Sequence, residues 1–404
     1  MTITMTMKRF FSVNHCALAL AACVAAAAPS LLAQINVPYA DGSDGALNIT
    51  GTNVIDLSQA VTGVWTNTSG SPGNGIYDPT QWAVVFKYSS VNIAANAMLT
   101  FTNHPTHAPV VWLVNGNVTI NGNLSLDGQT GNSDPLNLPE PGPGGFRGGG
   151  SPLYGAGSGF GPGGGPPGGY GGNGGGSYYG NYGNPQIIPL IGGSGGGGNA
   201  YYGINGCGGG GAILIAATGT TTVNGLCHAN GGYGADPGSG GAIRLVANQI
   251  AGNGTIQAVG GNGSTTGRIR LEGNSVSPAL TNNPLTAGVA PANPATIFPA
   301  TNAPMVTVYS VNGLNAPADP KAMMSANTSA DDLTMATTNS VIIVLQTQNF
   351  PTTGPVTVYV KPRNSSSSTL TASFVSGNTN SAFWQVSTPL PYPAHTVIQA
   401  HATY

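Results

Sequence analysis

Short runs of β-branched, aromatic and aliphatic residues recur along most of the chain, and Asn-Gly or Gly-Gly pairs separate them. From about Trp82 onward, such runs stand at residues 84–86, 99–101, 110–114 and 118–120. Apolar runs of this length, bounded by turn residues, are typical of β-strands. The runs follow one another too closely for helices to lie between them, so the pattern predicts an all-β fold.

Two half-units repeat through the middle of the chain. Their copies are NGNLSLDG at 121–128, NGLCHANG at 224–231 and NGTIQAVG at 253–260, and GAILIA at 211–216, GAIRLV at 241–246 and GRIRLE at 267–272. Apart from one long interruption, successive copies start 26 to 30 residues apart, which is typical of a solenoid coil. Two strands per coil, with glycine at the corners, predict a parallel β-helix over residues 82–276 whose coils stack on one another.

Side chains alternate between the two faces of a strand, so the repeats also predict which residues point inward. The inward positions are Leu124, Leu126, Ile213, Ile215, Ile243, Leu245, Ile256, Ala258, Ile269 and Leu271. Cys227 falls in the column of Leu124 and Ile256, so we expect it in the core. A disulfide with Cys207, the other cysteine of the exported chain, is the alternative for this pair.

A long insertion at 141–210 interrupts the repeats and is very rich in glycine. Because glycine loses the most entropy on ordering, the simplest interpretation is a flexible excursion from one coil. The alternative is a set of packed extended glycine segments of polyproline-II type, with tyrosine as an adhesive contact. The tyrosines of the insertion are Tyr154, Tyr170, Tyr178, Tyr179, Tyr182, Tyr201 and Tyr202.

The remaining parts of the chain differ from the repeats in composition and in the spacing of their apolar runs. Residues 34–81 are expected to form a β-rich N-terminal cap, and residues 277–303, rich in Pro, Ala, Asn and Thr, to form a linker. Residues 304–404 contain about seven short strand-like runs, which predict an immunoglobulin-like β-sandwich. Cysteines are absent from this part, so such a domain lacks an inter-sheet disulfide.

The first 33 residues have the three-part plan of a secretory signal. Lys8 and Arg9 precede an apolar stretch at 17–28, and small residues lead to a cleavage site after Ala33. An alternative is a lipoprotein signal with Cys23 lipidated, although the chain stays apolar beyond it. We expect an exported protein without a membrane span, because no later apolar segment reaches the length of a membrane helix.

Charge is scarce, with 10 Lys or Arg and 12 Asp or Glu among 404 residues. Without clustered Lys and Arg, the chain lacks the basic surface that nucleic acids require, so we expect no nucleic-acid partner. Low charge also removes the repulsion that keeps proteins apart, which favours self-association. The 64 glycines and 31 prolines exclude long helices.

A resemblance can be stated on these residues. APVVWLVNGNVTINGNLSLDG, the glycine-rich insertion, GGAIRLVA and GRIRLEG resemble bacterial exported glycine-rich parallel β-helix proteins. Residues 304–404 are similar to the small immunoglobulin-like domain that often follows them. The resemblance covers most of residues 75–404. The group has no assigned activity, so the resemblance implies a fold and an exported location but no function.

The outward column of the repeats carries the main candidate site. Arg244 and Arg270 share one outward register on neighbouring rungs, and Arg268 lies beside them. Like charges directly opposite one another are destabilising. Either Glu272 or Asp236 compensates these arginines, or the three form a weak site for an anion or a sugar. Because Arg244 points outward, its replacement by Ala is expected to be nearly neutral.

Other chemistry is less well supported. Pectin-active enzymes share the β-helix fold, but glycoside hydrolysis needs two facing carboxylates. The repeats offer only Asp127, Asp134, Asp236 and Glu272, at different corners. GGYGAD at 231–236 resembles a calcium-binding repeat but occurs once, and His104 and His107 lack an obvious third ligand. We predict no catalytic residue, no metal and no cofactor.

Together these features favour a non-enzymatic, exported structural or adhesive protein of the cell surface or extracellular matrix. Its expected contacts are a polysaccharide, a surface or further copies of the chain. The alternative is a carbohydrate-binding or carbohydrate-processing β-helix protein. Ice binding through a flat polar ladder is a third interpretation, which the mixed outward positions do not favour.

Overall fold

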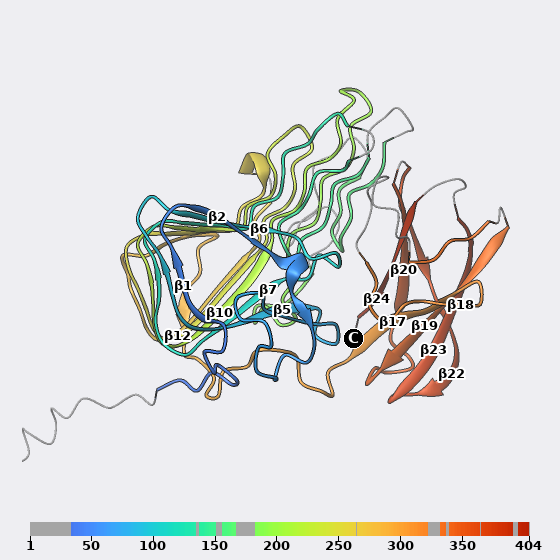
Figure 1. The fold of residues 1–404 in the computed structure, drawn as a ribbon. Helices are drawn as coiled ribbons and strands as arrows, with labels where there is room; N and C mark the ends of the chain where they lie inside the picture. Colours follow the sequence, from blue (N-terminus) through green and yellow to red (C-terminus); the bar gives the residue numbers. More distant parts are fainter. Residues whose placement is uncertain are drawn as a thin grey trace, which may run out of the picture. The chain divides into compact units, whose positions relative to one another are not determined.

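The computed structural model describes residues 34–134, 137–150, 156–166, 182–263, 265–321, 332–336, 339–363, 365–390 and 395–403. In these ranges the regular elements are β-strands, apart from the short 3₁₀ turns η1 (Leu57–Gln59) and η3 (Gly261–Gly263) (Figure 1). The predicted all-β class is therefore confirmed. Within the same ranges, no helix has the length and hydropathy needed to cross a membrane. The predicted leader at 1–33, with Cys23, lies outside the described residues.

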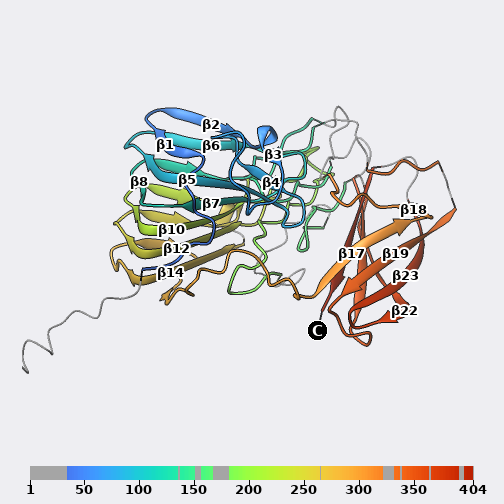
Figure 2. The ribbon, with the colours of Figure 1, turned by 60° about the horizontal axis from the view of Figure 1, so that its bottom comes forward.

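The larger sheet is almost entirely parallel. Its ten described strands are β1 (Gly45–Ile49), β3 (Val61–Thr62), β4 (Ile76–Asp78), β5 (Ala83–Ile93), β7 (Val110–Val114), β8 (Val118–Ile120), β10 (Ala212–Val223), β12 (Ala242–Ala251), β14 (Arg268–Val276) and β16 (Gly288–Val289). The order is β16-β14-β12-β10-β7-β5-β4-β3, with β1 on β5 and β8 between β5 and β10. Figure 2 shows the main rungs stacked in this order. Among the described pairs of this sheet, β4 with β5 is the antiparallel one.

A second parallel sheet is made of shorter strands. They are β2 (Thr52–Asp56), β6 (Met98–Thr102), β9 (Asn123–Ser125), β11 (Leu226–His228), β13 (Thr255–Gln257) and β15 (Thr281–Asn283), in the order β15-β13-β11-β9-β6-β2. From β9 to β16 successive strands belong alternately to the shorter and the larger sheet. Each pair of successive strands therefore adds one strand, or rung, to each sheet. Ile213 pairs with Ile243, and Cys227 lies between Leu124 and Ile256. The repeat register predicted from the sequence is confirmed.

The side chains between the two sheets form the main core. Every residue of the predicted inward set is buried there, including Leu124 and Ile256 from the short strands and Ile213, Leu245 and Leu271 from the long ones. Each rung has one apolar face that it cannot bury alone, and the neighbouring rungs cover it. Cys227 lies in the same cluster, as its column predicts.

The outer face of the larger sheet is also covered. Val85, Val111 and Leu214 on this face pack against Ile35, Val37, Ala295 and Ile297 from the two flanking segments. The predicted linker at 277–303 is therefore wrong in part. It contains β15 and β16, which continue the two sheets, and then a segment that packs on the outer face. Its Pro-rich and uncharged composition concealed this role.

The described glycine-rich segments form packed layers beside the sheets. Gly149 donates to Gly196 O (2.8 Å), Gly196 to Cys207 O (2.9 Å), and Gly193 to Gly210 O (2.8 Å). A Cβ added at Gly195 would overlap the carbonyl oxygen of Arg147. The flexible-excursion interpretation is thus wrong for these residues, because their bare backbones approach closely and satisfy each other's polar groups. Tyr154, Tyr170, Tyr178 and Tyr179 lie outside the described residues.

The C-terminal strands form two antiparallel sheets. The first sheet has the order β18-β17-β19-β23-β22 and contains β17 (Met305–Val311), β18 (Leu314–Asn315), β19 (Ser340–Gln348), β22 (Ser373–Asn378) and β23 (Ser381–Pro389). The second sheet has the order β21-β20-β24 and contains β20 (Val356–Pro362), β21 (Ser368–Thr371) and β24 (Thr396–Ala402). Alternate residues of β19 are buried, and Ile343 and Leu345 among them pack with Val358 and Trp384. These strands therefore share an apolar core that is separate from the one between the parallel sheets.

Hydrogen bonds connect this C-terminal part to the glycine layers. The Lys361 amine donates to Gly159 O (3.3 Å) and to Gly161 O, and Gly150 N donates to Arg363 O (3.0 Å). The Lys361 side chain is buried, and burial lowers its pKa to about 8. These contacts involve two carbonyls and one amide of the glycine-rich insertion, so its described part also contacts the C-terminal strands.

Candidate functional site

The predicted arginine column is present, but it is neutralised and covered. Arg244 and Arg270 pair directly between β12 and β14, and Glu272 accepts from Nε of both, at 2.8 Å and 2.7 Å. Glu272 is therefore the compensating group, and Asp236 is not. Arg244 is only 2% exposed and also donates to Thr296 O at 2.8 Å. The covering segment buries this side chain, so the structure removes the basis for expecting Arg244→Ala to be nearly neutral.

The other arginines of this group also contact the protein itself. Arg268 donates to Tyr182 O (3.1 Å), and Arg270 donates to Pro185 O (3.3 Å). The three arginines thus bind Glu272 and backbone carbonyls of the segments that cover them. This geometry does not support the predicted weak anion or sugar site at Arg244, Arg268 and Arg270.

Cys207 and Cys227, the cysteines among the described residues, are free and buried. Cys227 lies in the main core, whereas Cys207 lies in the glycine layers and its Sγ accepts from Gly131 N at 3.1 Å. The possible disulfide between them is not formed, since the two side chains belong to different layers. Burial raises the pKa of Cys207 to about 11 and that of Cys227 to about 12, so both thiols stay protonated at neutral pH.

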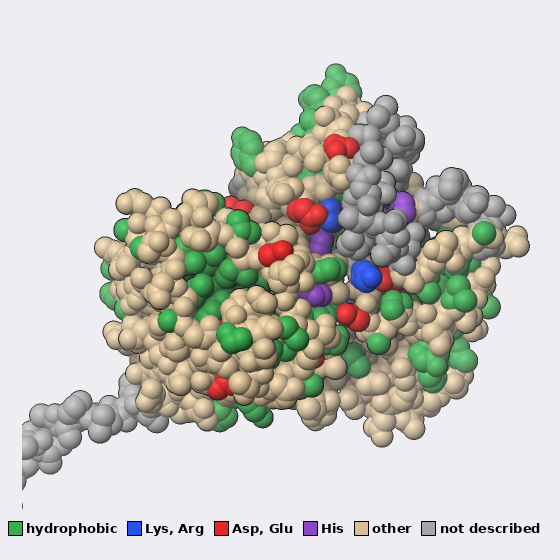
Figure 3. All heavy atoms as spheres, viewed as in Figure 1, with side chains coloured by type: hydrophobic (Ala, Val, Ile, Leu, Met, Phe, Trp, Pro, Cys, Tyr) green, Lys and Arg blue, Asp and Glu red, His purple; other side chains and the backbone are tan. Residues whose placement is uncertain are grey.

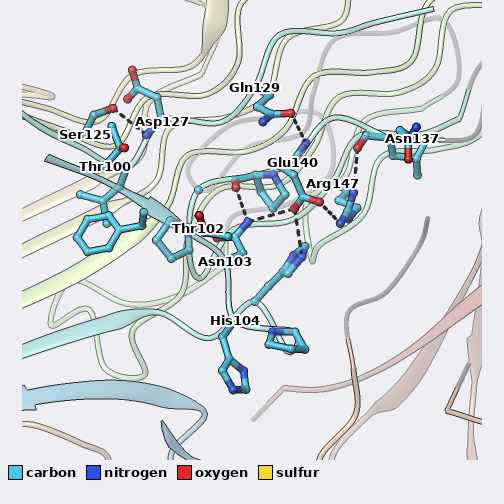
Figure 4. A pocket seen from close by; sticks show the side chains of 18 of the residues that line it. Thr100, Thr102, Asn103, His104, Ser125, Asp127, Gln129, Asn137, Glu140 and Arg147 are labelled. Atoms are coloured by element: carbon cyan, nitrogen blue, oxygen red, sulfur yellow. Dashed lines mark hydrogen bonds and ion pairs between the residues drawn. The ribbon is translucent and has the colours of Figure 1, made fainter. Parts of the chain in front are cut away.

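A cavity of about 580 Å³ is lined by many polar side chains. It lies where the end of β6 and the chain after β9 meet the segment at 137–143, which leads into the glycine-rich insertion, and Figure 4 shows its side chains. In the surface view, several acidic, basic and histidine side chains lie in the middle of the face shown (Figure 3). In a chain with so few charges, this concentration marks the cavity as the candidate site.

Glu140 is the centre of the polar network in this cavity. Its carboxylate accepts from Arg147 and from Asn103 Nδ2 (3.1 Å), and its Oε2 lies 3.4 Å from His107 Nε2. Arg147 also donates to Leu138 O (2.9 Å), and Asn103 to Pro141 O (2.8 Å). Burial and the nearby Arg147 lower the pKa of His107 to about 3, so this imidazole is neutral at physiological pH.

A second carboxylate, Asp127, lines the same cavity. Its Oδ1 accepts from Asn230 N (2.6 Å) and lies 2.8 Å from His228 Nδ1. The other ring nitrogen of His228 lies 2.5 Å from Asn123 Oδ1. Asp127 and Glu140 are 35% and 38% exposed, so both can be reached from solvent.

The histidines singled out in the sequence have structural partners. His104 Nδ1 lies 2.8 Å from Thr106 Oγ1, and the ring stacks on Tyr77 with a centroid distance of 3.9 Å. His107 faces Glu140. In the described ranges, no group of three His, Cys, Asp or Glu side chains could hold a metal ion.

A second candidate surface is the turn between Asn199 and Ile204, which we call the tyrosine turn. Asn199 and Ile204 close it by a β-bridge, and Asn199 Oδ1 accepts from the backbone N–H groups of Tyr201 and Tyr202, both at 3.0 Å. Tyr201 is 88% exposed and Tyr202 is 63% exposed. Their rings meet edge to face, 4.9 Å apart.

The sequence did not point to the cavity. Its polar residues come from separate segments that share no motif. Glu140 directly precedes the glycine-rich insertion, and Arg147 stands near its start. The one available signal was the rarity of charge: Arg147 is the single charged residue between Pro141 and Gly210, and it lies close to Glu140 in the sequence.

Comparisons of the chain with protein-family models, with curated proteins and with solved structures gave no match.

Proposed function

We propose that the chain is an exported, non-enzymatic structural or adhesive protein of the cell surface or extracellular matrix. In this proposal the two alternating parallel sheets are a β-helix, and the C-terminal sheets are an immunoglobulin-like domain. The observation that carries the adhesive role is the pair of exposed tyrosines, Tyr201 and Tyr202, on a turn that the glycine layers hold in place.

Hydrogen bonds to neighbouring segments fix the two ends of the tyrosine turn, in addition to the bonds inside the turn. Gly198 donates to Gly157 O (2.8 Å), and Asn205 donates to Asn132 O (2.6 Å), so both ends of the turn are tied to neighbouring segments. Tyrosine side chains offer a large, amphipathic contact area at a small cost in conformational entropy. An ordered turn that exposes two such rings is suited to contact with another surface.

A neighbouring turn adds a third aromatic ring. Tyr233 is exposed, and Asp236 in the same turn makes a side-chain hydrogen bond with Asn199 of the tyrosine turn. Cys207 N also donates to Asp236 O (2.9 Å). The two turns are therefore linked, and three tyrosines share the same part of the glycine layers.

The test compares surface attachment of the secreted protein with that of the Tyr201→Ala/Tyr202→Ala double variant. Attachment to cells or matrix from the producing culture should fall at least tenfold, while the melting curve stays unchanged because both rings are exposed. Tyr309→Ala, at an exposed tyrosine on β17, is the matched control and should attach normally. Unchanged attachment of the double variant, or recovery of the protein only inside the cell, would contradict the proposal.

The alternative, a carbohydrate-binding or carbohydrate-processing protein, no longer has support from the arginine column. The cavity favours its binding form, since Asp127 and Glu140 already accept hydrogen bonds from the protein and still have exposed oxygens. A sugar bound in the cavity by a protein whose tyrosine turn has no effect on attachment would favour this alternative over the adhesive role.

A further inference from the structure

The cavity beside Glu140 has the dimensions and construction of a small-molecule site. Its volume of about 580 Å³ lies within the range of roughly 300–1,000 Å³ that is usual for such sites. It shares none of its lining residues with the tyrosine turn. Its function can therefore differ from the adhesive contact proposed above.

The acceptors in the cavity are held in place before any ligand binds. Glu140 is fixed by Arg147, Asn103 and His107, and Asp127 is fixed by the backbone of Asn230. Each carboxylate oxygen has two lone pairs, so these contacts leave capacity for further donors. Held acceptors lower the entropy cost of binding a ligand rich in hydroxyl groups.

The charge of the cavity argues against an anionic ligand. The positive charge of Arg147 is already matched by Glu140, and His107 is neutral because its pKa is lowered to about 3. Asp127 adds a second carboxylate, and Nδ1 of His228 lies 2.8 Å from its Oδ1. A uronate or a sulfate would meet acceptors where it needs donors, whereas neutral hydroxyl groups can donate to both carboxylates.

Apolar groups complete the lining. The half-buried Phe101 lines the cavity, together with Pro105 and Leu126. Sugar rings have one face of C–H groups and an edge of hydroxyl groups, so a lining that holds both apolar side chains and two carboxylates matches both parts. Gln129 contributes an amide, which can donate and accept.

We propose that this cavity binds a neutral saccharide, whose hydroxyl groups donate to Asp127 and Glu140 and whose ring packs against Phe101. The saccharide site differs from the tyrosine turn in its residues and its ligand, so loss of one leaves the other intact.

The test titrates the purified full chain with cellobiose, maltose, chitobiose and digalacturonate, followed by saturation-transfer NMR and calorimetry. At least one neutral disaccharide should bind saturably, and digalacturonate should bind at least tenfold more weakly. Asp127→Asn retains an acceptor for Asn230 but loses the charge, so it should weaken binding of the neutral disaccharide about tenfold, equivalent to about 1.4 kcal/mol.

A pair of matched substitutions tests the location. Thr102→Trp places a large ring at an exposed position of the cavity lining on β6, and Thr281→Trp makes the same change at an exposed position of β15 in the same sheet. Binding should be lost in Thr102→Trp and kept in Thr281→Trp and in Tyr201→Ala/Tyr202→Ala. No binding of any neutral disaccharide, tighter binding of digalacturonate, or full binding by Thr102→Trp would each overturn the proposal.

Discussion

Arg244 on β12 and Arg270 on β14 occupy directly paired positions on neighbouring parallel strands, and Oε1 of Glu272 lies within 2.8 Å of Nε in both. Two like charges at this spacing would repel each other without the shared carboxylate. Because Arg244 and Glu272 are both buried, water screens this cluster very little. The cluster therefore couples the last rungs of the larger sheet to the segment that covers them.

Glu272→Gln should strongly destabilise the protein. The substitution leaves the buried Arg244 without its carboxylate, and breaking one side of a buried ion pair costs about 3–5 kcal/mol. Urea denaturation of the purified chain measures this loss. Asp56→Asn is the control, because Asp56 is exposed and asparagine can also cap η1. A loss below about 1 kcal/mol in Glu272→Gln would show that the cluster is not a buried unit.

Leu245→Ala should cost about 2–5 kcal/mol of unfolding free energy, because it opens a cavity between stacked rungs. The same substitution at Leu285, which is exposed, should be close to neutral. Comparing the two melting curves separates the effect of burial from that of the residue type. Equal effects at both positions would contradict the assignment of Leu245 to the inner face.

Gly195→Ala should destabilise the protein severely, because the new Cβ overlaps a carbonyl oxygen of the neighbouring segment. Gly70→Ala has open space around the new Cβ and is the matched control. Circular dichroism and thermal melting of the two variants measure the difference. If the insertion were a flexible excursion, both variants would melt like the unmodified protein.

Lys361 should make stability depend on alkaline pH. Burial lowers its pKa in the folded protein from 10.5 to about 8. Between these values the unfolded chain binds more protons at this site than the folded chain, so the free energy of unfolding should rise as pH increases from 8 to 10.5. Urea denaturation across this range measures the slope.

Lys361→Met should remove this contribution to the slope, and Lys321→Met, at an exposed lysine, should keep it. The tyrosines, which also titrate at alkaline pH, are unchanged in both variants, so the difference between the variants isolates Lys361. A slope that is the same in Lys361→Met as in the unmodified protein would show that this amine is not buried against the glycine layers.

The regular part of the fold could be predicted because its periodicity is local. The alternation of Ile243 and Leu245 with outward residues, repeated at the spacing of one coil, specified the faces and the pairing of the rungs. The same alternation could not show that Arg244 is buried. Its cover comes from Thr296 and the residues around it, which are distant in the sequence and have no pattern that marks them as packed.

The glycine-rich segments were misjudged for a different physical reason. Glycine favours disorder when a segment is considered alone, since its backbone loses the most entropy on ordering. The structure compensates through backbone hydrogen bonds such as those of Gly149 and Gly196, which need close approach and therefore the absence of side chains. Such contacts leave no periodic signal, so neither the layers nor the cavity wall at Glu140 could be located from the sequence.

The tyrosine turn and the cavity wall both depend on ordered glycine layers, and amide hydrogen exchange measures that order directly. In the native protein, the amides of Gly192, Gly193, Gly195, Gly196, Gly198 and residues 206–211 should be protected to a degree comparable with those of β10 and β12, because they donate to carbonyls of neighbouring segments. Exchange of these glycine amides at the rate of an unstructured chain, with β10 still protected, would contradict the ordered layers and both proposals that rest on them.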